Sequence, residues 1–600
     1  MDEHPAERAS MTPEPRGAWA ILAGIWLGVV AVSWAVHARS PLPPHSAHDA
    51  FLLVPQLANL LGGAVPDDPS FGMFHPTWFS ERAIPYGALG ADGFVERIFG
   101  NVQDHTWIDA PHPMILMAWV HWLVPMGTLG PLGIQCLYFL VLMVSVFSIG
   151  SQVGTARIGL MAAVLVAGTP GLFGAIHYIE PHLSVAAMSA ASVALLLRSE
   201  GMRRWGWSVA ASLCLWSLSR SGEGSGEVVI AGLVVVGPVF ATIIGSDRRL
   251  HPLRWMVGLC ALALPLLLLA DLAWMVAAME RVTRAFADPA VQTDVVAKGG
   301  WLSTAAAWVM AYGVLSITDY FRPALAVVVG VGVVGALRAG GRGRWMLAAW
   351  LIVPWVALSW MQRKASWYGI ALLPPAIVWA AMGLDRMLSA KGRAAVWCLA
   401  LGQFLAFSLV PRDSFPSAIA WFRDPLPLHD WRLRRIEYLQ PATSAQGHKR
   451  VRRDLDRLVE WAQSTGDDRP IALMTMGTQH DYAARYYLQM ARPGIDAVNL
   501  GDPRLRAARY RSLHPDDFGA FVFLDQGAEP WPPSAEQRAW LRENLRCEAG
   551  DPFDAFVAAV LARAEPSSEA FTRLSPVTSG PLGPGQVWPA VPISGGLCDP

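Results

Sequence analysis

The feature that most constrains this chain is a series of long apolar runs separated by short, arginine-rich loops. A helix needs about 20 predominantly apolar residues to cross the core of a bilayer. Eleven runs come close to that length: 18–37, 128–150, 156–177, 181–198, 204–219, 227–245, 253–278, 322–338, 345–361, 367–385 and 394–411. The sequence therefore predicts a polytopic α-helical membrane protein with about 11 transmembrane helices.

The composition agrees with this prediction. Hydrophobic residues make up 53% of the 600 residues and charged residues 16%, which is typical of a membrane protein with a water-soluble part attached. The formal net charge is zero and the chain has no basic tract, so nothing indicates nucleic-acid binding.

The arginine-rich loops predict the topology. They are 151–157, 198–204, 246–254, 338–344 and 386–393, and each follows an even-numbered run, so all five lie on one side of the membrane. By the positive-inside rule that side is the cytoplasm. The polar N-terminal tail, 1–17, is then cytoplasmic, and the first run has no convincing cleavage site and is interpreted as a retained anchor. The part after residue 411 is extracytoplasmic, and the location is the inner (plasma) membrane.

Carboxylate and histidine side chains, the candidates for catalysis and binding, are concentrated on the predicted outer side. The first extracytoplasmic loop, 38–112, holds eight carboxylates, and eight of the 15 histidines fall between His45 and His182. Two apolar segments, 113–125 and 301–318, are interpreted as interfacial helices on this side, the first because it is too short to span. An acidic, histidine-rich face beside apolar helices indicates an active site more than a packing surface.

The C-terminal part has a different pattern. Strands are predicted at 471–477 and 519–525 between helices at 451–465, 480–491 and 534–546, which indicates a small extracytoplasmic α/β domain over 412–566. Residues 567–600 form a tail rich in Pro, Gly and Ser, which we expect to be loosely ordered. Cys547 and Cys598 could pair in an oxidising compartment, but the sequence leaves this open.

Asp49 opens an amphipathic stretch shortly after the first span. Apolar residues such as Phe51, Leu57 and Leu61 have the spacing of a helix that lies in the membrane interface. A carboxylate at the start of such a helix points at the water–lipid boundary, where a lipid-linked substrate would present its headgroup. The alternative is an ordinary N-cap, because aspartate is favoured there for hydrogen-bonding reasons alone.

Several motifs resemble those of a known family. An acidic residue opens a juxtamembrane helix after the first span, a His-Pro motif opens an interfacial helix, a Thr-Pro-Gly motif falls in the third span, and a Lys-x-x-x-Tyr-x-x-x-x-x-Pro pattern occurs near the tenth. Here these are Asp49, His112-Pro113-Met114, Thr169-Pro170-Gly171, and Lys364, Tyr368 and Pro374. In this order, residues 18–411 resemble the glycosyltransferase C superfamily, in its protein-mannosyltransferase and aminoarabinose-transferase-like branch.

The resemblance implies a hexosyl- or pentosyltransferase at the outer membrane face. It implies a polyprenyl-phosphate-linked sugar as donor, a lipid, glycan or protein as acceptor, and inversion at the anomeric carbon. Asp49 takes the position of the general base that removes a proton from the acceptor. Arg220, Arg363 and Lys364 are candidates to hold the leaving phosphate. The alternatives are pairing of Arg220 with Glu223 and snorkelling of the other two side chains to the interface.

His112 and Tyr368 lie in the matched motifs and are further substrate-binding candidates. The fourth span departs from the family pattern, because Glu180-Pro181-His182 stands where relatives have Pro-Asp. Glu180 could supply the displaced carboxylate, and His182 could be a ligand or a hydrogen-bond partner.

A divalent metal is a further hypothesis for the outer face. His45 and His48 lie just before Asp49 in the sequence. Together with Asp49, Glu180 and His182 they could bind such an ion, because imidazole and carboxylate suit several metals. No spacing among them is diagnostic, and polar residues lining a wet cavity are the alternative. No cofactor is otherwise predicted.

A transporter or flippase for lipid-linked or anionic substrates is the rival class. It would need charge near the membrane midplane and discontinuous helices in paired halves. This sequence instead places its charges at one end, and no internal repeat is visible.

Overall fold

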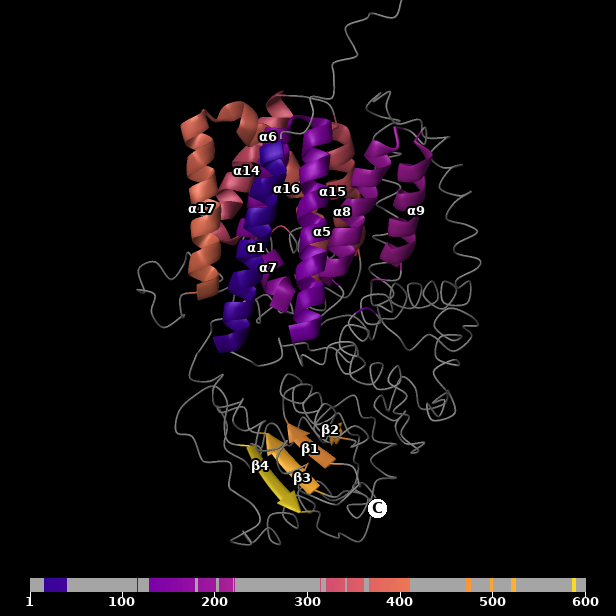
Figure 1. Ribbon diagram of the computed structural model, residues 1–600, viewed down its shortest axis with the longest axis vertical. Coiled ribbons are helices and arrows are strands. Elements are labelled where there is room, and N and C mark those ends of the chain that lie inside the picture. Colours follow the sequence, from indigo (N-terminus) through magenta and orange to yellow (C-terminus); the bar gives the residue numbers. More distant parts are fainter. Residues whose placement is uncertain are drawn as a thin grey trace, which may run out of the picture. The chain divides into compact units, whose positions relative to one another are not determined.

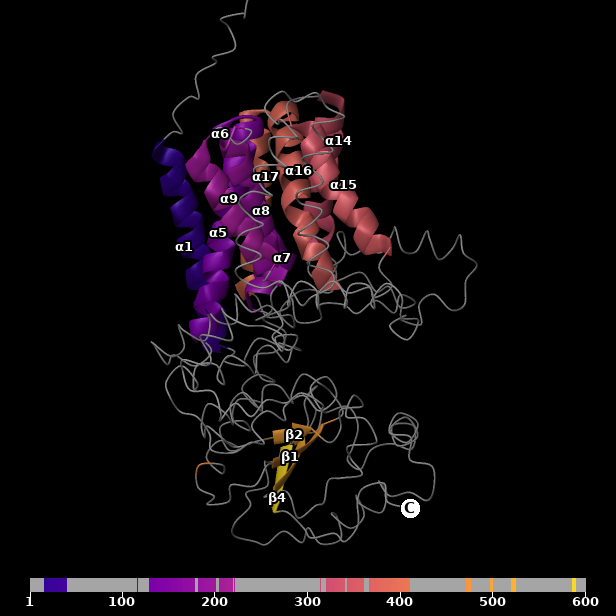
Figure 2. The ribbon, with the colours of Figure 1, turned by 90° about the vertical axis from the view of Figure 1, so that its right-hand side faces the viewer.

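Figures 1 and 2 show the protein in a computed structural model. The structure describes residues 16–39, 116, 129–177, 182–200, 204–219, 221, 313, 320–339, 343–360, 366–409, 463, 471–475, 497–499, 520–524 and 585–589. The chain divides into two compact units, which are described separately. The first holds residues 1–38 and the helical bundle from residue 132 to 409, and the second holds the strands.

The first unit is a bundle of apolar helices. Its elements are α1 (Arg16–Arg39), α5 (Leu129–Val153), α6 (Ala156–Gly168), α7 (Pro170–His177), α8 (His182–Arg198), α9 (Trp205–Ser219), α14 (Arg322–Ala339), α15 (Arg344–Trp360), the 3₁₀ helix η7 (Ser366–Leu372), α16 (Leu373–Met387) and α17 (Ala390–Leu409). Each predicted span that falls within the described residues coincides with helix. The predicted spans 227–245 and 253–278 and the interfacial helix 301–318 lie outside the described residues, and residue 116 alone is described of the interfacial helix 113–125.

Length and hydropathy identify which helices are able to cross a membrane. Among the described residues these are Gly17–Val36, Leu132–Val153, Gly369–Met387 and Ala390–Leu409, and the bent pair α6–α7 would make a fifth span. His182–Arg198 and Trp345–Leu358 are shorter apolar helices. The prediction of a polytopic helical membrane protein is confirmed, and the number of 11 spans stays a prediction.

The predicted span 156–177 is not one straight helix. It is divided into α6 and α7, which meet at an angle of 58°. Thr169 ends α6 in an extended conformation, and its hydroxyl donates to the carbonyl of Leu165 at 2.6 Å. Pro170 then starts α7, because proline lacks an N–H and clashes with a preceding helical turn. The break therefore comes from the Thr-Pro pair.

The bundle is built around α6 and α16. Almost every residue of α6 from Ile158 to Gly168 is buried, and so is α16 from Leu373 to Leu384, except Ala376. Helix α1 lies at the edge of the bundle beside α5 (Figure 2), and 22% of its apolar window is buried. The indole of Trp26 donates to the carbonyl of Cys136 at 3.0 Å. Helices that are apolar on all sides, as these are, suit a bundle surrounded by lipid.

Small residues allow the central helices to approach closely. A β-carbon added at Gly383 of α16 would meet the carbonyl oxygen of Gly332 on α14 and lie 2.6 Å from the amide nitrogen of Ala336. A β-carbon at Gly168 of α6 would lie 2.6 Å from that of Ala400 on α17. Such contacts replace the hydrophobic driving force that is missing between helices in lipid.

We expect Gly383→Ala to destabilise the bundle by about 1–3 kcal/mol, because the added methyl group must push two backbones apart. The matched control is Gly330→Ala on α14, where a β-carbon would meet nothing within 4 Å. Thermal unfolding of the detergent-purified protein checks this. Equal unfolding temperatures for the two variants would contradict the close α14–α16 contact.

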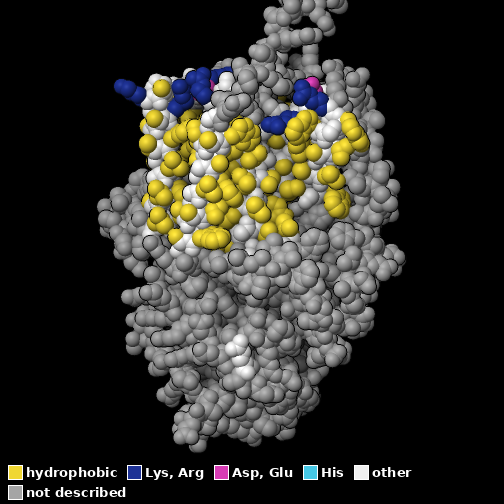
Figure 3. All heavy atoms as spheres, in the orientation of Figure 1, with side chains coloured by type: hydrophobic (Ala, Val, Ile, Leu, Met, Phe, Trp, Pro, Cys, Tyr) yellow, Lys and Arg dark blue, Asp and Glu magenta, His cyan; other side chains and the backbone are white. Residues whose placement is uncertain are grey.

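Basic side chains gather at one end of the bundle, along the upper rim in Figure 3. Four of the arginine-rich segments fall between described helices, namely α5 and α6, α8 and α9, α14 and α15, and α16 and α17; residues 201–203 and 340–342 within them lie outside the described residues. Each loop connects two antiparallel helices at this end (Figure 1), as the sequence predicts. We call it the basic end. The fifth loop, 246–254, lies outside the described residues, and the side of the membrane on which the basic end lies stays a prediction.

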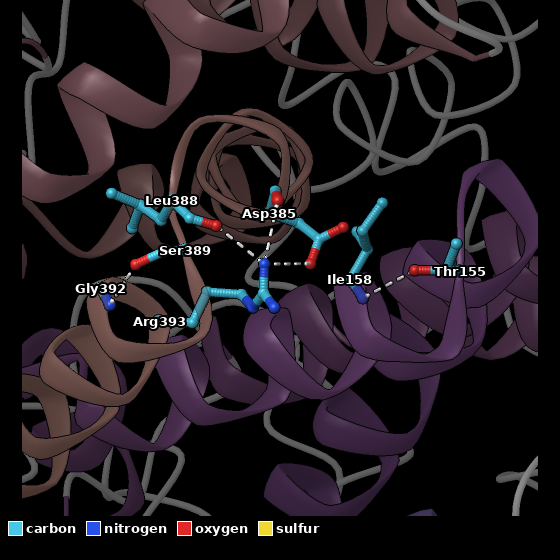
Figure 4. A network of polar contacts seen from close by, with 7 residues as sticks. All are labelled: Thr155, Ile158, Asp385, Leu388, Ser389, Gly392 and Arg393. Carbon is cyan, nitrogen blue, oxygen red and sulfur yellow. Dashed lines mark hydrogen bonds and ion pairs between the residues drawn. The ribbon is translucent and has the colours of Figure 1, made fainter.

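Arginine at the basic end also has a structural use, as Figure 4 shows for the α16–α17 turn. The guanidinium of Arg393 donates to the carbonyls of Leu388 at 2.8 Å and Asp385 at 3.3 Å, and lies 3.6 Å from the carboxylate of Asp385. Nearby, the hydroxyl of Thr155 accepts from the amide of Ile158 and caps α6. This arginine therefore satisfies carbonyl groups at the end of α16.

The second unit contains a four-stranded sheet in the order β2-β1-β3-β4. The strands are β1 (Ile471–Thr475), β2 (Ala497–Asn499), β3 (Ala520–Leu524) and β4 (Gly585–Pro589). β1 pairs in parallel with β2 and β3, and β4 is antiparallel to β3. The predicted strands 471–477 and 519–525 correspond to β1 and β3.

Two strands are absent from the sequence-based prediction. They are β2 and β4. β4 lies within the Pro/Gly-rich segment 567–600, so the sheet extends past residue 566. Antiparallel pairing with β3 orders this part of the predicted tail. The predicted helices 480–491 and 534–546 and both cysteines lie outside the described residues, and of 451–465 the structure describes residue 463 as helical. The α/β domain thus stays a prediction.

Candidate active site

Most of the residues predicted for the site lie outside the described residues. These are Asp49, His45, His48, His112, Glu180, Arg220, Arg363 and Lys364. Of the remaining two, Tyr368 lies in η7, where the structure describes its backbone, and His182 is the first residue of α8 and is 3% exposed.

Helix α8 contacts two further segments that contain or adjoin predicted site residues. The hydroxyl of Ser184, one half-turn from His182, lies 3.4 Å from the carbonyl oxygen of Ser221, which follows Arg220 in the chain. Helix η7, which contains Tyr368, packs against α8. The three motifs come from sequence positions up to about 190 residues apart, so the fold and not the sequence spacing makes them neighbours.

A second histidine lies close by in the chain. Helix α7 ends at His177, which is 9% exposed, and Glu180 falls between His177 and His182 in the sequence. The ring of Phe173 packs edge-on against the imidazole of His177 at 4.9 Å and against Phe404 of α17 at 4.8 Å. The short helix α7 is therefore fixed to α17 through an aromatic contact.

A buried arginine, Arg322, starts α14 at the end of the bundle opposite the basic end. It is 2% exposed, and its guanidinium carbon lies 5.6 Å from the centre of the Phe407 ring. Among the arginine and lysine side chains whose burial the structure describes, no other is buried. Burial of a guanidinium is costly unless it meets a negative or polar group, and in a membrane protein such a residue is a functional candidate.

The backbone at Arg322 is strained. Its φ of +65° lies in the left-handed region, which few residues other than glycine adopt, and Pro323 follows it. Strain of this kind persists where the surroundings impose it, and it is concentrated at functional sites.

Two contacts impose this conformation. The amide of Gln403 donates to the carbonyl of Phe321 at 2.7 Å, and Gln403 is itself 2% exposed. On the other side, Tyr320 packs on Gly171 of α7 so closely that a β-carbon added there would lie 2.8 Å from the tyrosine Cα. Helices α7 and α17 thus hold residues 320–322 between them.

Sequence reasoning missed Arg322, Gln403 and His177. The sequence contains one signal for Arg322. It begins the predicted span 322–338 at the end that the positive-inside rule places outside, where arginine is disfavoured. Gln403 has no such signal in the sequence. Among the described residues, no group of three His, Cys, Asp or Glu side chains is placed to hold a metal ion. The metal hypothesis for His45 and His48 concerns residues outside that set and stays a hypothesis.

Comparison with known proteins places this arrangement in a fold family. No family model matches the chain, and no curated protein matches it in sequence. Two solved structures cover it almost end to end, both of ArnT from Cupriavidus metallidurans. The apo structure covers 95% of this chain and 98% of its own, with a TM-score of 0.53 and 15% sequence identity. The structure bound to undecaprenyl phosphate covers 98% and 100%, with a TM-score of 0.51 and 15% identity.

This chain has the fold of these ArnT structures. The resemblance predicted from the sequence is thereby confirmed for the fold. At 15% identity the likeness shows the fold alone, so activity and substrates belong to the proposal that follows. Within this fold, Arg322, His177 and His182 are buried polar residues of the helical bundle.

Proposed function

We propose that this protein is a membrane glycosyltransferase that takes a sugar from a polyprenyl-phosphate donor and transfers it, with inversion, to a lipid, glycan or protein. The observation that carries the proposal is the end-to-end likeness in fold to ArnT bound to undecaprenyl phosphate. A buried guanidinium at the end of the bundle opposite the basic end adds support, because it suits an anionic substrate group. In this proposal the protein lies in the inner (plasma) membrane with its N-terminus in the cytoplasm. Sugar transfer takes place on the extracytoplasmic face.

The proposed chemistry is a single displacement. The carboxylate of Asp49 accepts the proton of the acceptor hydroxyl or amine as the acceptor atom forms a bond to the anomeric carbon. The bond from that carbon to the phosphate oxygen breaks at the same time, and its electron pair leaves with the polyprenyl phosphate. Attack from the face opposite the phosphate inverts the anomeric centre. The protein must therefore supply a base on one side and positive charge on the other.

We assign the positive charge to Arg322 in addition to the predicted Arg220, Arg363 and Lys364. The two residues before Arg322 are anchored, Phe321 by the hydrogen bond from Gln403 and Tyr320 by its contact with Gly171, so the backbone that carries Arg322 has a defined position. A pre-positioned charge in a site of low polarity stabilises developing negative charge better than a mobile one in water. Gln403 and Gly171 are positioning residues in this proposal.

Glu180, His182, His112 and Tyr368 are assigned to substrate binding. The packing of η7 against α8 and the contact of Ser184 with Ser221 support a shared site for His182, Tyr368 and the segment after Arg220. A divalent ion held by His45 and His48, if one binds, would add positive charge near the sugar or phosphate.

The function is tested by comparing cells with and without the protein. Mass spectrometry of lipid-linked sugars and surface glycans should show a polyprenyl-phosphate sugar accumulating and one sugar missing from a glycan, lipid or protein when the protein is absent. The purified protein with that donor and acceptor should restore the modification. Movement of the donor across a liposome membrane without transfer would instead identify a flippase and overturn the proposal.

A further inference from the structure

The turn between α8 and α9 at the basic end is built from ordered, oppositely charged and aromatic side chains. Helix α8 ends at Arg198 and α9 begins at Trp205. The amide of Ser199 donates to the carbonyl of Leu195 at 2.9 Å, and that of Arg204 donates to the carbonyl of Ser199 at 3.0 Å. These bonds close the turn on itself and fix where its side chains project.

Arg198 is held by two other helices. Its Nε donates to the hydroxyl of Ser148 on α5 at 3.0 Å, and its guanidinium lies over the ring of Trp207 at 5.2 Å. The amide of Gln152 donates to the same hydroxyl at 3.0 Å and to the carbonyl of Ala194 at 3.3 Å, which joins α5 to α8. The guanidinium is therefore presented at a fixed position beside an indole, as in a cation–π pair.

Trp205, Trp207 and Arg204, which the structure describes, are exposed. Trp205 is 69% exposed and Trp207 is 37% exposed, although both are large apolar residues. Arg204 pairs with Glu200 at 2.7 Å, and its side chain keeps 48% of its surface exposed. Exposed tryptophans at a helix end mark the headgroup level of a bilayer, where an indole has both apolar and polar neighbours.

We propose that Arg198, Arg204, Trp205 and Trp207 bind the headgroup of an anionic phospholipid such as phosphatidylglycerol. Among the residues of this turn that the structure describes, Arg198 and Arg204 carry positive charge and Glu200 carries the one negative charge, so their net charge is positive. Guanidinium groups bind phosphate oxygens through charge-assisted hydrogen bonds, and basic side chains at the membrane surface attract anionic lipids. We call these four residues the α8–α9 patch. The inference does not depend on the proposed transferase activity.

The test is a lipid titration of the full-length protein in a neutral detergent, followed by native mass spectrometry. Dioleoylphosphatidylglycerol should bind in preference to dioleoylphosphatidylcholine. Arg204→Gln should weaken phosphatidylglycerol binding about tenfold, because it removes a charge-assisted hydrogen bond to the headgroup phosphate. Arg338→Gln removes the same charge from an exposed residue of the same end and should leave this binding unchanged.

Glu200→Gln separates lipid binding from a purely structural role of the ion pair. It breaks the pair as Arg204→Gln does, yet it raises the net charge, so phosphatidylglycerol should bind more tightly. Weaker binding in both variants would show that the pair only holds the turn together and would overturn the proposal. Equal losses in Arg204→Gln and Arg338→Gln, or no preference for phosphatidylglycerol, would also overturn it, since the attraction would then be diffuse or absent.

Discussion

Replacement of Asp49 by asparagine is expected to lower the rate of sugar transfer by about 10²- to 10⁴-fold, because a positioned general base contributes a factor of this size. The amide cannot accept the acceptor's proton, although it has the shape of the carboxylate. Donor binding should change little, since the base acts on the acceptor. The measurement is the turnover rate of purified protein with a polyprenyl-phosphate sugar, together with the affinity for polyprenyl phosphate alone.

Asparagine also separates the two roles that the sequence leaves open for Asp49. Asparagine caps a helix as well as aspartate does, whereas alanine in place of a cap costs about 1 kcal/mol. If Asp49 is only an N-cap, Asp49→Asn will transfer sugar at the wild-type rate. Asp67→Asn, in the same loop 38–112, is the matched control and should keep full activity. Full activity of Asp49→Asn would remove Asp49 from the mechanism.

The helices could be predicted well from the sequence, because one physical requirement dominates them. A chain in lipid must satisfy its backbone hydrogen bonds within each span, so length and hydropathy are nearly sufficient. The run 18–37 is α1 (Arg16–Arg39) and the run 394–411 is α17 (Ala390–Leu409). The bend inside 156–177 does not follow from hydropathy, because a proline within an apolar run hardly changes the mean hydropathy of the run. The Thr169-Pro170 motif is the local signal for it.

The sheet was predicted in part for a similar reason. β1 and β3 are uninterrupted apolar runs, which is typical of strands that are paired on both sides. β2 has three residues, too few for a pattern, and β4 lies in a segment whose glycines and prolines indicate a loop. Its order comes from pairing with β3, a contact between residues about 65 positions apart that no local pattern encodes.

The candidate site is less accessible to prediction than the fold. His182 and Tyr368 were found through motifs, but Arg322 is defined by what surrounds it. Its conformation depends on Gln403, 81 residues later, and on Gly171, 151 residues earlier, through Phe321 and Tyr320. Burial of a polar side chain is a property of tertiary packing, so a sequence can show that an arginine is unusual there but not what holds it.

Arg322→Gln is expected to raise the donor KM about 10- to 100-fold, because a lost charge-assisted hydrogen bond to phosphate costs about 1.5–3 kcal/mol and about 1.4 kcal/mol is a factor of ten. The turnover number should also fall, because the charge stabilises the leaving phosphate more than the bound donor. Arg322→Lys should recover part of both effects, since it keeps the charge and loses the planar fork. Steady-state kinetics over a range of donor concentrations measures the two parameters separately.

A structural role for Arg322 predicts a different result, and a control on the same helix distinguishes the two. Arg338→Gln removes a charge from the other end of α14 and should leave KM and turnover number unchanged. Gln403→Leu removes the hydrogen bond to Phe321 and keeps the charge, so it should raise KM less than Arg322→Gln does. If Arg322→Gln lowers the unfolding temperature yet binds undecaprenyl phosphate as the wild type does, the guanidinium stabilises the bundle against Phe407 and does not contact the donor. If Arg322→Gln binds undecaprenyl phosphate more weakly but unfolds at the wild-type temperature, the guanidinium belongs to the donor site. A residue that only packs in the bundle would change the unfolding temperature and leave phosphate binding as it is.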